Sequence, residues 1–167
     1  MKARPRSVEN RVADALNEHF QRLGCASVER IPVLGRTGPD ISINEMNLVV
    51  DVKSRLEVPK AIFFPLAVPF AFDRMVAVRL TNLSTLWDPE QYAAPLDFSS
   101  KIIRGYLEHM EEWTKAKAPA GVSCVILHRP EMPVGSSVVV IYSTSRRRLF
   151  EYAEHRYQQC LSDDCPE

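Results

Sequence analysis

The sequence predicts a small mixed α/β domain in which helices flank a β-sheet. Apolar residues recur every three to four positions near both ends of the chain, which is typical of amphipathic helices. Short β-branched runs lie between these stretches, as expected for strands. The chain has 167 residues, 46% hydrophobic and 25% charged, which is enough for one domain with a full core.

The first half of the chain begins with a helix and continues with strands. An apolar stripe predicts a helix over residues 8–23, followed by a short strand over 28–34. Two alternating apolar and polar runs flank a turn at 44–47. We therefore expect residues 40–53 to form a β-hairpin.

The second half is harder to interpret because residues 56–98 contain five prolines. This segment is a candidate insertion within the single domain 1–167. Apolar periodicity and β-branched runs predict the remaining elements. They are strand 75–80, helix 99–117, strands 122–127 and 138–142, and helix 146–160. We expect residues 161–167 to be a mobile acidic tail.

The charge of the whole chain is balanced, with 21 Lys+Arg and 21 Asp+Glu. Nucleic-acid-binding proteins are usually basic, so this balance alone argues against such a partner. However, residues 151–167 hold one basic and five acidic residues, which leaves 20 basic and 16 acidic residues in the rest. The overall charge is therefore neutral evidence on nucleic-acid binding.

Several classes of protein do not fit the sequence. The most apolar run, residues 61–72, is short and contains two prolines, so we expect no membrane span. No apolar stretch follows the basic N-terminus, so no signal peptide is expected. The four cysteines form no disulfide or metal pattern, which favours a cytoplasmic protein. The sequence has no Gly-rich phosphate loop or dinucleotide fingerprint, so we expect no nucleotide cofactor.

Acidic residues in the predicted hairpin give the strongest indication of function. Asp40 opens the first strand, and Asp51 and Lys53 close the second. Alternate residues share one face of a strand, so Asp51 and Lys53 lie opposite the core-facing Val50 and Val52. A suitable register would bring the carboxylate of Asp40 beside that of Asp51.

Such a pair of carboxylates predicts a metal site. Two neighbouring carboxylates repel each other unless a proton or cation lies between them. Oxygen ligands with open positions suit Mg²⁺, which accepts water and phosphate oxygens as further ligands. A lysine on the same face would orient or deprotonate a water molecule, or stabilise developing negative charge. This combination predicts phosphodiester hydrolysis.

The motif Gly38-Pro39-Asp40, ten residues, then Asp51-Val52-Lys53-Ser54-Arg55, with Glu9 on a preceding helix, resembles the PD-(D/E)xK nuclease superfamily. Its second half is similar to archaeal-type Holliday-junction resolvases and their phage-encoded relatives. The similarity covers about residues 7–55, and Asp51 stands where many members carry Glu. It implies a restriction-endonuclease-like core with a small mixed β-sheet flanked by helices.

The resemblance also implies roles for individual residues. Asp40, Asp51, Glu9 and the carbonyl of Val52 would bind Mg²⁺, with Mn²⁺ as a substitute. Lys53 would be the catalytic lysine, and Glu9, Asp40 and Asp51 would share in catalysis. The substrate would be DNA, with a branched junction as the leading form, and the protein a homodimer in a bacterial or phage-infected cell. The expected DNA contacts are Ser54, Arg55, Arg36 and Arg6.

Other interpretations remain open at this stage. An acid two residues before a lysine arises by chance about 0.7 times in such a chain. Acidic residues such as Glu9 favour the first turn of any helix. Asp51 and Lys53 would also suit a solvated strand face. Two other functions fit the motif: a sequence-specific duplex endonuclease of homing or restriction type, and a non-catalytic DNA-binding or assembly protein that retains the fold.

Two basic clusters also have more than one interpretation. Arg146-Arg147-Arg148 would either contact phosphates or form a solvated helix start, and the second is preferred. The pair His128-Arg129 would either approach DNA or be a loop pair without special role, and the second is again preferred.

Overall fold

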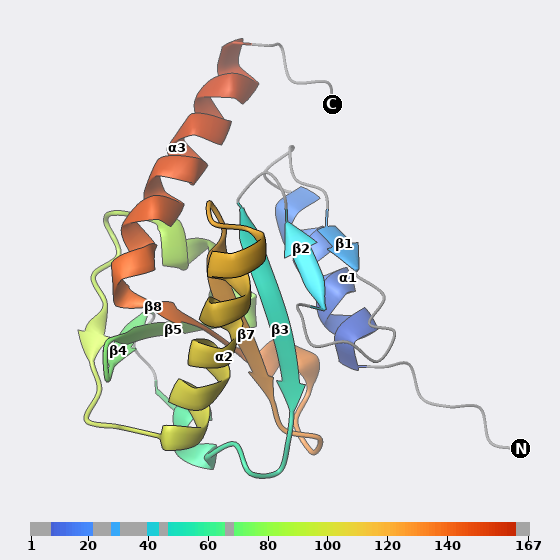
Figure 1. The fold of residues 1–167 in the computed structure, drawn as a ribbon, viewed down its shortest axis with the longest axis vertical. Helices are drawn as coiled ribbons and strands as arrows, with labels where there is room; N and C mark the ends of the chain where they lie inside the picture. The colour runs from blue at the N-terminus through green and yellow to red at the C-terminus, as the bar shows by residue number, and fades with distance from the viewer. Residues whose placement is uncertain (1–7, 22–27, 31–39, 44–46, 66–68, 163–167) are drawn as a thin grey trace, which may run out of the picture.

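A mixed β-sheet with helices on both faces forms the centre of the molecule (Figure 1). The computed structural model describes residues 8–21, 28–30, 40–43, 47–65 and 69–162, with backbone alone for Glu9, 19–21, 28–30 and 156–162. Three α-helices lie in this part: α1 (Val8–Gln21), α2 (Lys101–Lys117) and α3 (Arg146–Ser162). The strands are β1 (Val28–Arg30), β2 (Ile41–Ile43), β3 (Leu48–Ser54), β4 (Phe70–Phe72), β5 (Met75–Arg79), β6 (Ala94–Pro95), β7 (Val122–His128) and β8 (Val138–Tyr142).

The strand order in the sheet is β1-β2-β3-β7-β8-β5-β4-β6. Strands β1, β2 and β3 pair antiparallel, whereas β3 and β7 are parallel neighbours. A parallel pair requires a long crossover connection, which α2 and the segment before it supply. On the other side of β7, the strands β8, β5 and β4 are again antiparallel, and the two-residue β6 pairs parallel with β4.

Two hydrophobic clusters pack on the two faces of the sheet. On the face that we call the α1 side, α1, α3 and a 3₁₀ segment (η3, Leu80–Trp87) cover the sheet. On the opposite face, the α2 side, α2 and a second 3₁₀ segment (η2, Lys60–Phe63) cover it. Because both faces are covered, β7 is buried along its whole length, as is usual for a parallel strand in such a layer structure.

Most of the elements predicted from the sequence are confirmed. The helix at 8–23 is α1, the hairpin at 40–53 is the β2–β3 pair, and the small mixed α/β fold is as expected. The predicted helix at 99–117 is α2, in which the Ser100 side chain caps the N-terminus by accepting from the Ile103 amide at 3.3 Å. The parts of these predictions that lie outside the described residues are 22–23 of the helix, 31–34 of the strand, 44–46 of the turn and 163–167 of the tail. The predicted tail begins too early, because residues 161 and 162 belong to α3.

The proline-rich segment 56–98 contributes strands β4, β5 and β6 to the same sheet. A two-residue turn at Asp73 and Arg74 joins β4 to β5, and both residues have positive φ angles of 43° and 64°, as hairpin turns of this length require. The segment therefore widens the central sheet. Its edge strand β6 has only two residues and ends at Pro95, which has no amide to donate to a strand ladder.

The first arginine of the 146–148 cluster has a structural role that the sequence did not indicate. The Arg146 guanidinium donates to the carbonyl oxygens of Leu86 at 3.0 Å and Gln91 at 2.6 Å, and also reaches those of Thr85 and Asp88. The interpretation as a solvated helix start is therefore wrong for Arg146, whereas Arg147 is exposed and lies 3.7 Å from Glu151. The charge of Arg146 holds the end of η3 against α3.

The described helices do not include one with the length and apolar character needed to cross a membrane.

Candidate active site at the end of strand β3

Asp40 is held at the start of β2 by the backbone of β3. Its amide donates to the carbonyl oxygen of Val50 at 2.8 Å, and its Oδ2 accepts from the amide of Val52, also at 2.8 Å. Ile41 pairs with Val50, which puts Asp40 opposite Asp51 across the hairpin. The register therefore brings together the two acids that ten intervening residues separate in the sequence motif.

The two carboxyl groups lie close enough to affect each other. The pKa of Asp40 is raised to about 6, mainly by burial of the carboxyl group. A hydrogen bond with Asp51 and the negative charge of Asp51 contribute in the same direction, whereas the amide of Val52 and the charge of Lys53 act to lower the pKa. Asp51 itself is only 8% exposed, so the interpretation of this position as a solvated strand face is wrong. A pair of carboxyl groups in such a setting favours a shared proton or a bound cation.

Lys53 completes the arrangement on the same face of β3. Its Nζ lies 3.3 Å from Oδ2 of Asp51 and 5.5 Å from the centroid of the Tyr106 ring in α2. One quarter of the Lys53 side chain is exposed, compared with 11% of that of Asp51. The ammonium group is therefore held beside the carboxylates and still reaches solvent, which a residue that acts on an incoming substrate requires.

Tyr106 and Glu57 form a further part of the site that the sequence did not reveal. The Tyr106 hydroxyl donates a short hydrogen bond to Oε1 of Glu57. Burial raises the pKa of Tyr106 to about 12, and the carboxylate of Glu57 contributes in the same direction. In the sequence, Tyr106 belongs to the apolar stripe that predicts helix 99–117. The only signal in the sequence that could have distinguished it was a polar hydroxyl on an apolar helix face.

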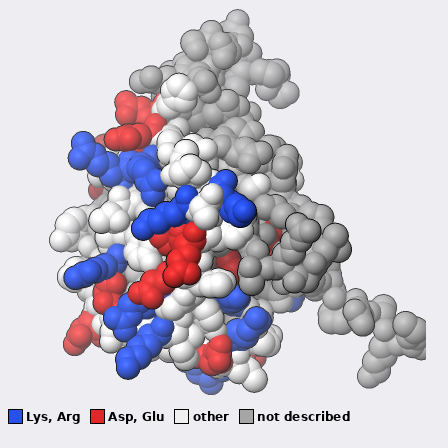
Figure 2. Space-filling view, in the orientation of Figure 1, with Lys and Arg blue, Asp and Glu red and all other residues white. Residues whose placement is uncertain are grey.

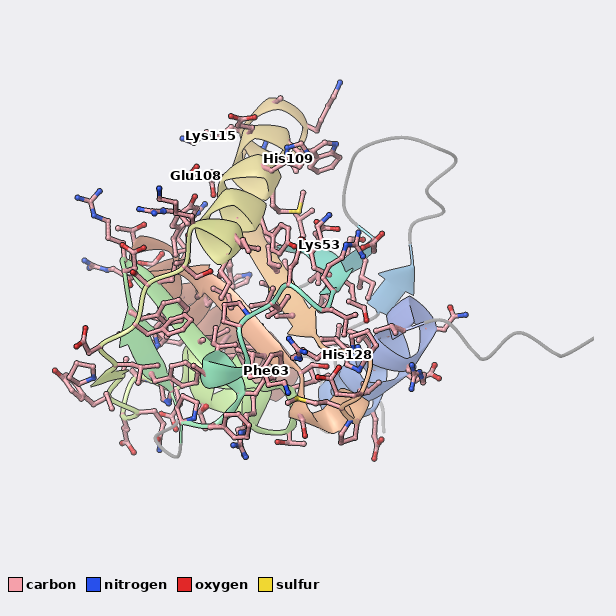
Figure 3. All side chains as sticks on the ribbon, turned by 90° about the horizontal axis from the view of Figure 1, so that it is seen from below. Lys53, Phe63, Glu108, His109, Lys115 and His128 are labelled. Carbon is pink, nitrogen blue, oxygen red and sulfur yellow. The ribbon has the colours of Figure 1, made fainter. Side chains whose placement is uncertain are left out.

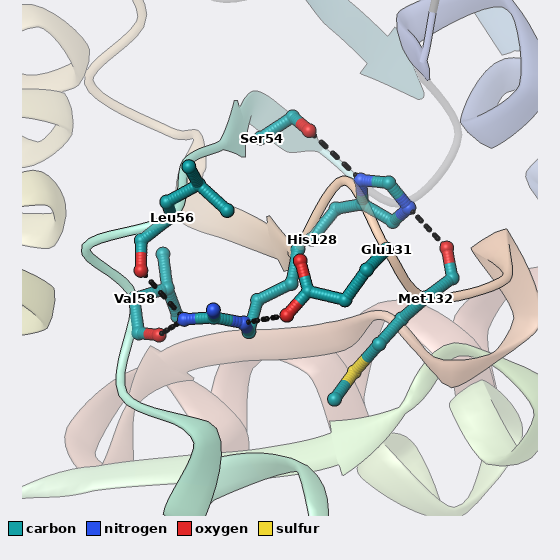
Figure 4. A network of polar contacts seen from close by, with 7 residues as sticks. Ser54, Leu56, Val58, His128, Glu131 and Met132 are labelled. Carbon is teal, nitrogen blue, oxygen red and sulfur yellow. Dashed lines mark hydrogen bonds and ion pairs between the residues drawn. The ribbon is translucent and has the colours of Figure 1, made fainter.

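The loop after β3 is anchored to the end of β7 by Arg129 (Figure 4). The Arg129 guanidinium donates to the carbonyl oxygens of Leu56 at 2.5 Å and Val58 at 2.7 Å, and to Oε1 of Glu131 at 2.5 Å. Glu57 lies between the two carbonyl acceptors. The clamp therefore fixes the backbone that presents Glu57 to Tyr106.

His128 links the ends of the parallel strands β3 and β7. One ring nitrogen, Nε2, lies 2.8 Å from the carbonyl oxygen of Met132, which can only accept, so Nε2 carries a proton. The other, Nδ1, lies 2.8 Å from the hydroxyl of Ser54 and, in the neutral ring, accepts from it. His128 is 1% and Arg129 is 9% exposed, so neither the DNA-contact nor the loop-pair interpretation of these residues is correct.

Figure 3 shows that Lys53 and His128 lie on opposite sides of the sheet, with Lys53 toward α2. Asp51 and Lys53 share the α2 side, because alternate residues of a strand point the same way. Ser54 and its partner His128 share the α1 side with Val50 and Val52. The carboxylates and the lysine thus belong to one face, and the Ser54–His128 contact supports the strand from the other.

The remaining predicted site residues are placed as follows. Arg55 is exposed directly after β3, and its guanidinium donates to the carbonyl of Ser54 at 3.0 Å. Glu9 lies in the first turn of α1, but its side chain is outside the described residues, as are Arg6 and Arg36 altogether. The roles of Glu9, Arg6 and Arg36 therefore stay predictions.

The donor set at Asp40 and Asp51 fits a hard divalent cation. Both side chains supply carboxylate oxygens as ligands. The N–H and C=O groups of one strand residue point to the same side of the strand. The carbonyl of Val52 therefore faces the β2 side of β3, where the amide of Val52 donates to Asp40. Within the described part of the chain, no three His, Cys, Asp or Glu side chains gather into a metal-binding group. The site as described therefore offers two carboxylates and one carbonyl, with water and substrate oxygens left to complete the coordination.

The surface over α2 carries both signs of charge. Figure 2 shows Lys and Arg side chains interspersed with Asp and Glu side chains over this helix. The described part of this face is thus not a uniformly basic surface, in agreement with the zero net charge. Any attraction for an anionic substrate has to come from local groups such as Lys53 and Arg55.

Comparisons of the chain with protein-family models, curated proteins and solved structures found no match.

Proposed function

We propose that the protein is a Mg²⁺-dependent DNA endonuclease of the PD-(D/E)xK type, selective for branched DNA in the manner of a Holliday-junction resolvase. The observation that carries this proposal is the convergence of Asp40, Asp51 and Lys53 on one face of the β2–β3 hairpin. These are the three residues on which the sequence resemblance depends. Their meeting in space was not required by their spacing alone.

Each of these side chains has a role in the proposed reaction. Asp40 and Asp51 would hold Mg²⁺ or Mn²⁺, with the carbonyl of Val52 as a further ligand. The bound cation would supply Lewis-acid chemistry, which polarises the phosphate and lowers the pKa of water. Lys53 would orient the attacking water or stabilise negative charge on the phosphate oxygens. Glu9 would assist as an additional acid.

The surrounding groups support Lys53 in this role. Asp51 and the face of the Tyr106 ring attract its ammonium group from two directions. Glu57 orients the Tyr106 ring through its hydroxyl, and Arg129 fixes the backbone on either side of Glu57. The lysine is therefore positioned before a substrate arrives, which lowers the cost of ordering it during the reaction.

The arrangement of the elements also supports the proposal. The two acids come from the adjacent antiparallel strands β2 and β3. The chain then leads from β3 through α2 to β7, which pairs parallel with β3. Helices cover both faces, as the restriction-endonuclease-like core implied by the resemblance requires. As further parts of this proposal, the protein acts as a homodimer, since resolution of a junction requires two coordinated cuts, and it works in the cytoplasm.

A cleavage assay with matched variants tests this function. Labelled four-way junctions, flaps, single strands and linear duplex are incubated with the protein and Mg²⁺, and the products are separated on denaturing gels. We expect Mg²⁺-dependent cleavage that is fastest on branched DNA. Asp51→Asn should slow cleavage at least about 100-fold. Asp97→Asn, which alters an exposed acid elsewhere, should leave the rate unchanged.

Three outcomes would change the proposal. Cleavage that Asp51→Asn leaves intact would show that another site is responsible. Fastest cleavage at a defined sequence in linear duplex would favour a homing- or restriction-type enzyme. Tight DNA binding without cleavage under any metal condition would favour a non-catalytic DNA-binding or assembly protein. One feature of the described residues favours this last function, because they supply two acids to the site rather than three.

A further inference from the structure

A pocket of about 290 Å³ lies between the start of β3 and the end of α2. Its lining is mostly apolar, and it includes one large aromatic side chain, Trp113, which is half-buried. The residues that line it include Ser42, Val49, Trp113, Pro119, Ala120 and Gly121. A volume of this size is at the lower end of the range for pockets that bind small molecules.

The pocket adjoins the candidate active site along both strands of the hairpin. Val49 precedes Asp51 by two residues on β3, and Ser42 follows Asp40 by two residues on β2. Residues two apart on a strand share a face and are separated by about 7 Å. The pocket therefore opens on the same face as the two carboxylates and begins about 7 Å from them, which is close to the length of one nucleotide.

Helix α2 provides an aromatic side chain to each of the two places. Tyr106 contacts Lys53 at the carboxylate end, and Trp113 lines the pocket seven residues later. Seven residues make nearly two helical turns, so both rings face the sheet from the same side of α2, about 10 Å apart along its axis. The site and the pocket therefore follow one another along the same side of α2.

The last turn of α2 carries exposed lysines close in sequence to the pocket lining. Lys115 and Lys117 are exposed in the last turn of α2, directly before Ala118 and Pro119 of the lining, and Figure 3 shows Lys115 at this end of the helix. An aromatic and apolar surface with cationic groups nearby is the combination with which proteins bind single-stranded nucleic acid through its bases and phosphates.

We propose that this pocket takes one unstacked DNA base next to the phosphate bound at Asp40 and Asp51. This inference rests on the proposed nuclease function and adds a reason for its choice of substrate. A base within an intact duplex is stacked on both sides and cannot enter such a pocket without being extruded. Single strands offer bases that are already free, and base pairs beside a branch point open more easily than those within a continuous duplex. The pocket therefore favours cleavage beside an unpaired nucleotide over cleavage of continuous duplex.

Tryptophan fluorescence gives a binding test that does not depend on cleavage. The chain has two tryptophans, and Trp87 is buried on the α1 side, where it serves as an internal reference. In the Asp51→Asn background, a short single-stranded oligonucleotide should quench the fluorescence of Trp113. Trp113→Phe should abolish this quenching and leave the signal of Trp87. Equal quenching in the Trp113→Phe variant, or none in either protein, would overturn the inference.

A second test combines a variant with a modified substrate. An abasic position placed directly beside the cleaved phosphate should weaken binding by the Asp51→Asn protein about tenfold. Ala120→Leu, which narrows the pocket at an exposed position, should weaken binding of the unmodified DNA by a similar factor and remove the sensitivity to the abasic position. Tyr92→Ala, at an exposed aromatic residue outside the lining, is the matched control.

The two proposals fail in different ways. If wild-type protein cleaves branched DNA but the abasic position has the same effect in the Ala120→Leu variant as in its parent, the pocket does not bind a base and the nuclease function stands. If the fluorescence and abasic results are as expected but no metal supports cleavage, the base pocket stands and the catalytic proposal fails.

Discussion

Strands β3 and β7 are parallel neighbours of equal length, yet they differ in what they carry on the α2 side. Their register pairs Asp51 with Val125 and Lys53 with Leu127. Val125 and Leu127 are fully buried beneath α2, in the same cluster as Leu107. At the positions paired with these two aliphatic side chains, β3 carries the acidic Asp51 and the basic Lys53.

This difference separates the needs of the fold from those of the site. β7 shows that apolar side chains satisfy the packing of this layer, so nothing in the sheet itself requires Asp51 or Lys53. Both are retained although partly buried charges cost stability. Helix α2 also covers the two strands to different extents. It packs mainly over β7, whereas Lys53 of β3 lies at the side of the helix, next to Tyr106. Of the two strands, β3 carries the polar side chains and is also the one that a substrate can reach.

The largest effect is expected from moving the acid to the wrong strand. Val125→Asp would bury a carboxylate under α2 without a partner and should lower the free energy of unfolding by at least about 4 kcal/mol. The reciprocal change, Asp51→Val, should leave stability equal or higher, because it removes the repulsion with Asp40. Urea unfolding of both variants measures the contrast. A similar loss of stability in the two proteins would show that β3 and β7 do not differ as described.

The next effect concerns Lys53 itself. Lys53→Met keeps the length of the side chain and its packing beside Tyr106 but removes the ammonium group. It should lower the cleavage rate about 100-fold or more, as expected when a group that orients or activates water is lost. Single-turnover cleavage of a labelled junction gives the rate. Lys101→Met, at an exposed lysine at the start of α2, should cleave normally, and equal rates in the two variants would exclude the proposed role.

Smaller effects on stability and cleavage are expected from substitutions of Tyr106, which contacts Lys53. Tyr106→Phe removes the hydrogen bond to Glu57 but keeps the ring under the ammonium group, so the free energy of unfolding should fall by about 1 kcal/mol. Tyr106→Ala removes the ring as well and should also lower the cleavage rate several-fold, since such a cation–ring contact is worth about 0.5–1 kcal/mol. Urea unfolding and single-turnover cleavage measure the two effects.

Tyr92→Phe removes an exposed hydroxyl elsewhere and serves as the control for Tyr106→Phe. If Tyr106→Ala cleaves as fast as the wild type, the ring does not position Lys53.

The last prediction concerns the dependence of stability on pH. The pKa of Asp40 is about 6 in the folded protein, mainly because of burial, compared with 3.8 for an ordinary aspartate. Between these values the folded state binds more protons than the unfolded state, so the contribution of Asp40 to stability falls as the pH rises from about 4 to above 6.

Urea unfolding in a chelator at pH 4, 5 and 8 measures this dependence. Asp40→Asn should remove it, so the wild type should lose stability relative to Asp40→Asn as the pH rises. A constant difference between the two proteins over this range would contradict the raised pKa.

How much of this could be predicted from the sequence differs between the fold and the site. The helices and main strands followed from local patterns, and the motif identified Asp40, Asp51 and Lys53. Tyr106, Glu57 and Arg129 could not be found in this way, because their contacts join β3, α2 and the end of β7 across long sequence separations. His128 and Arg129 looked like a loop pair, since nothing local shows that carbonyl groups from residues far away in the sequence would meet them.

The central claim is that the carboxylates of Asp40 and Asp51 bind one divalent cation. Titration with Mn²⁺, followed by the electron paramagnetic resonance signal of the free ion, tests it directly. The wild type and the Asp97→Asn control should each bind Mn²⁺ at this site, and Asp40→Asn and Asp51→Asn should each weaken that binding at least about tenfold. Binding that is the same in all four proteins, or no binding to the wild type at millimolar Mn²⁺, would contradict the account.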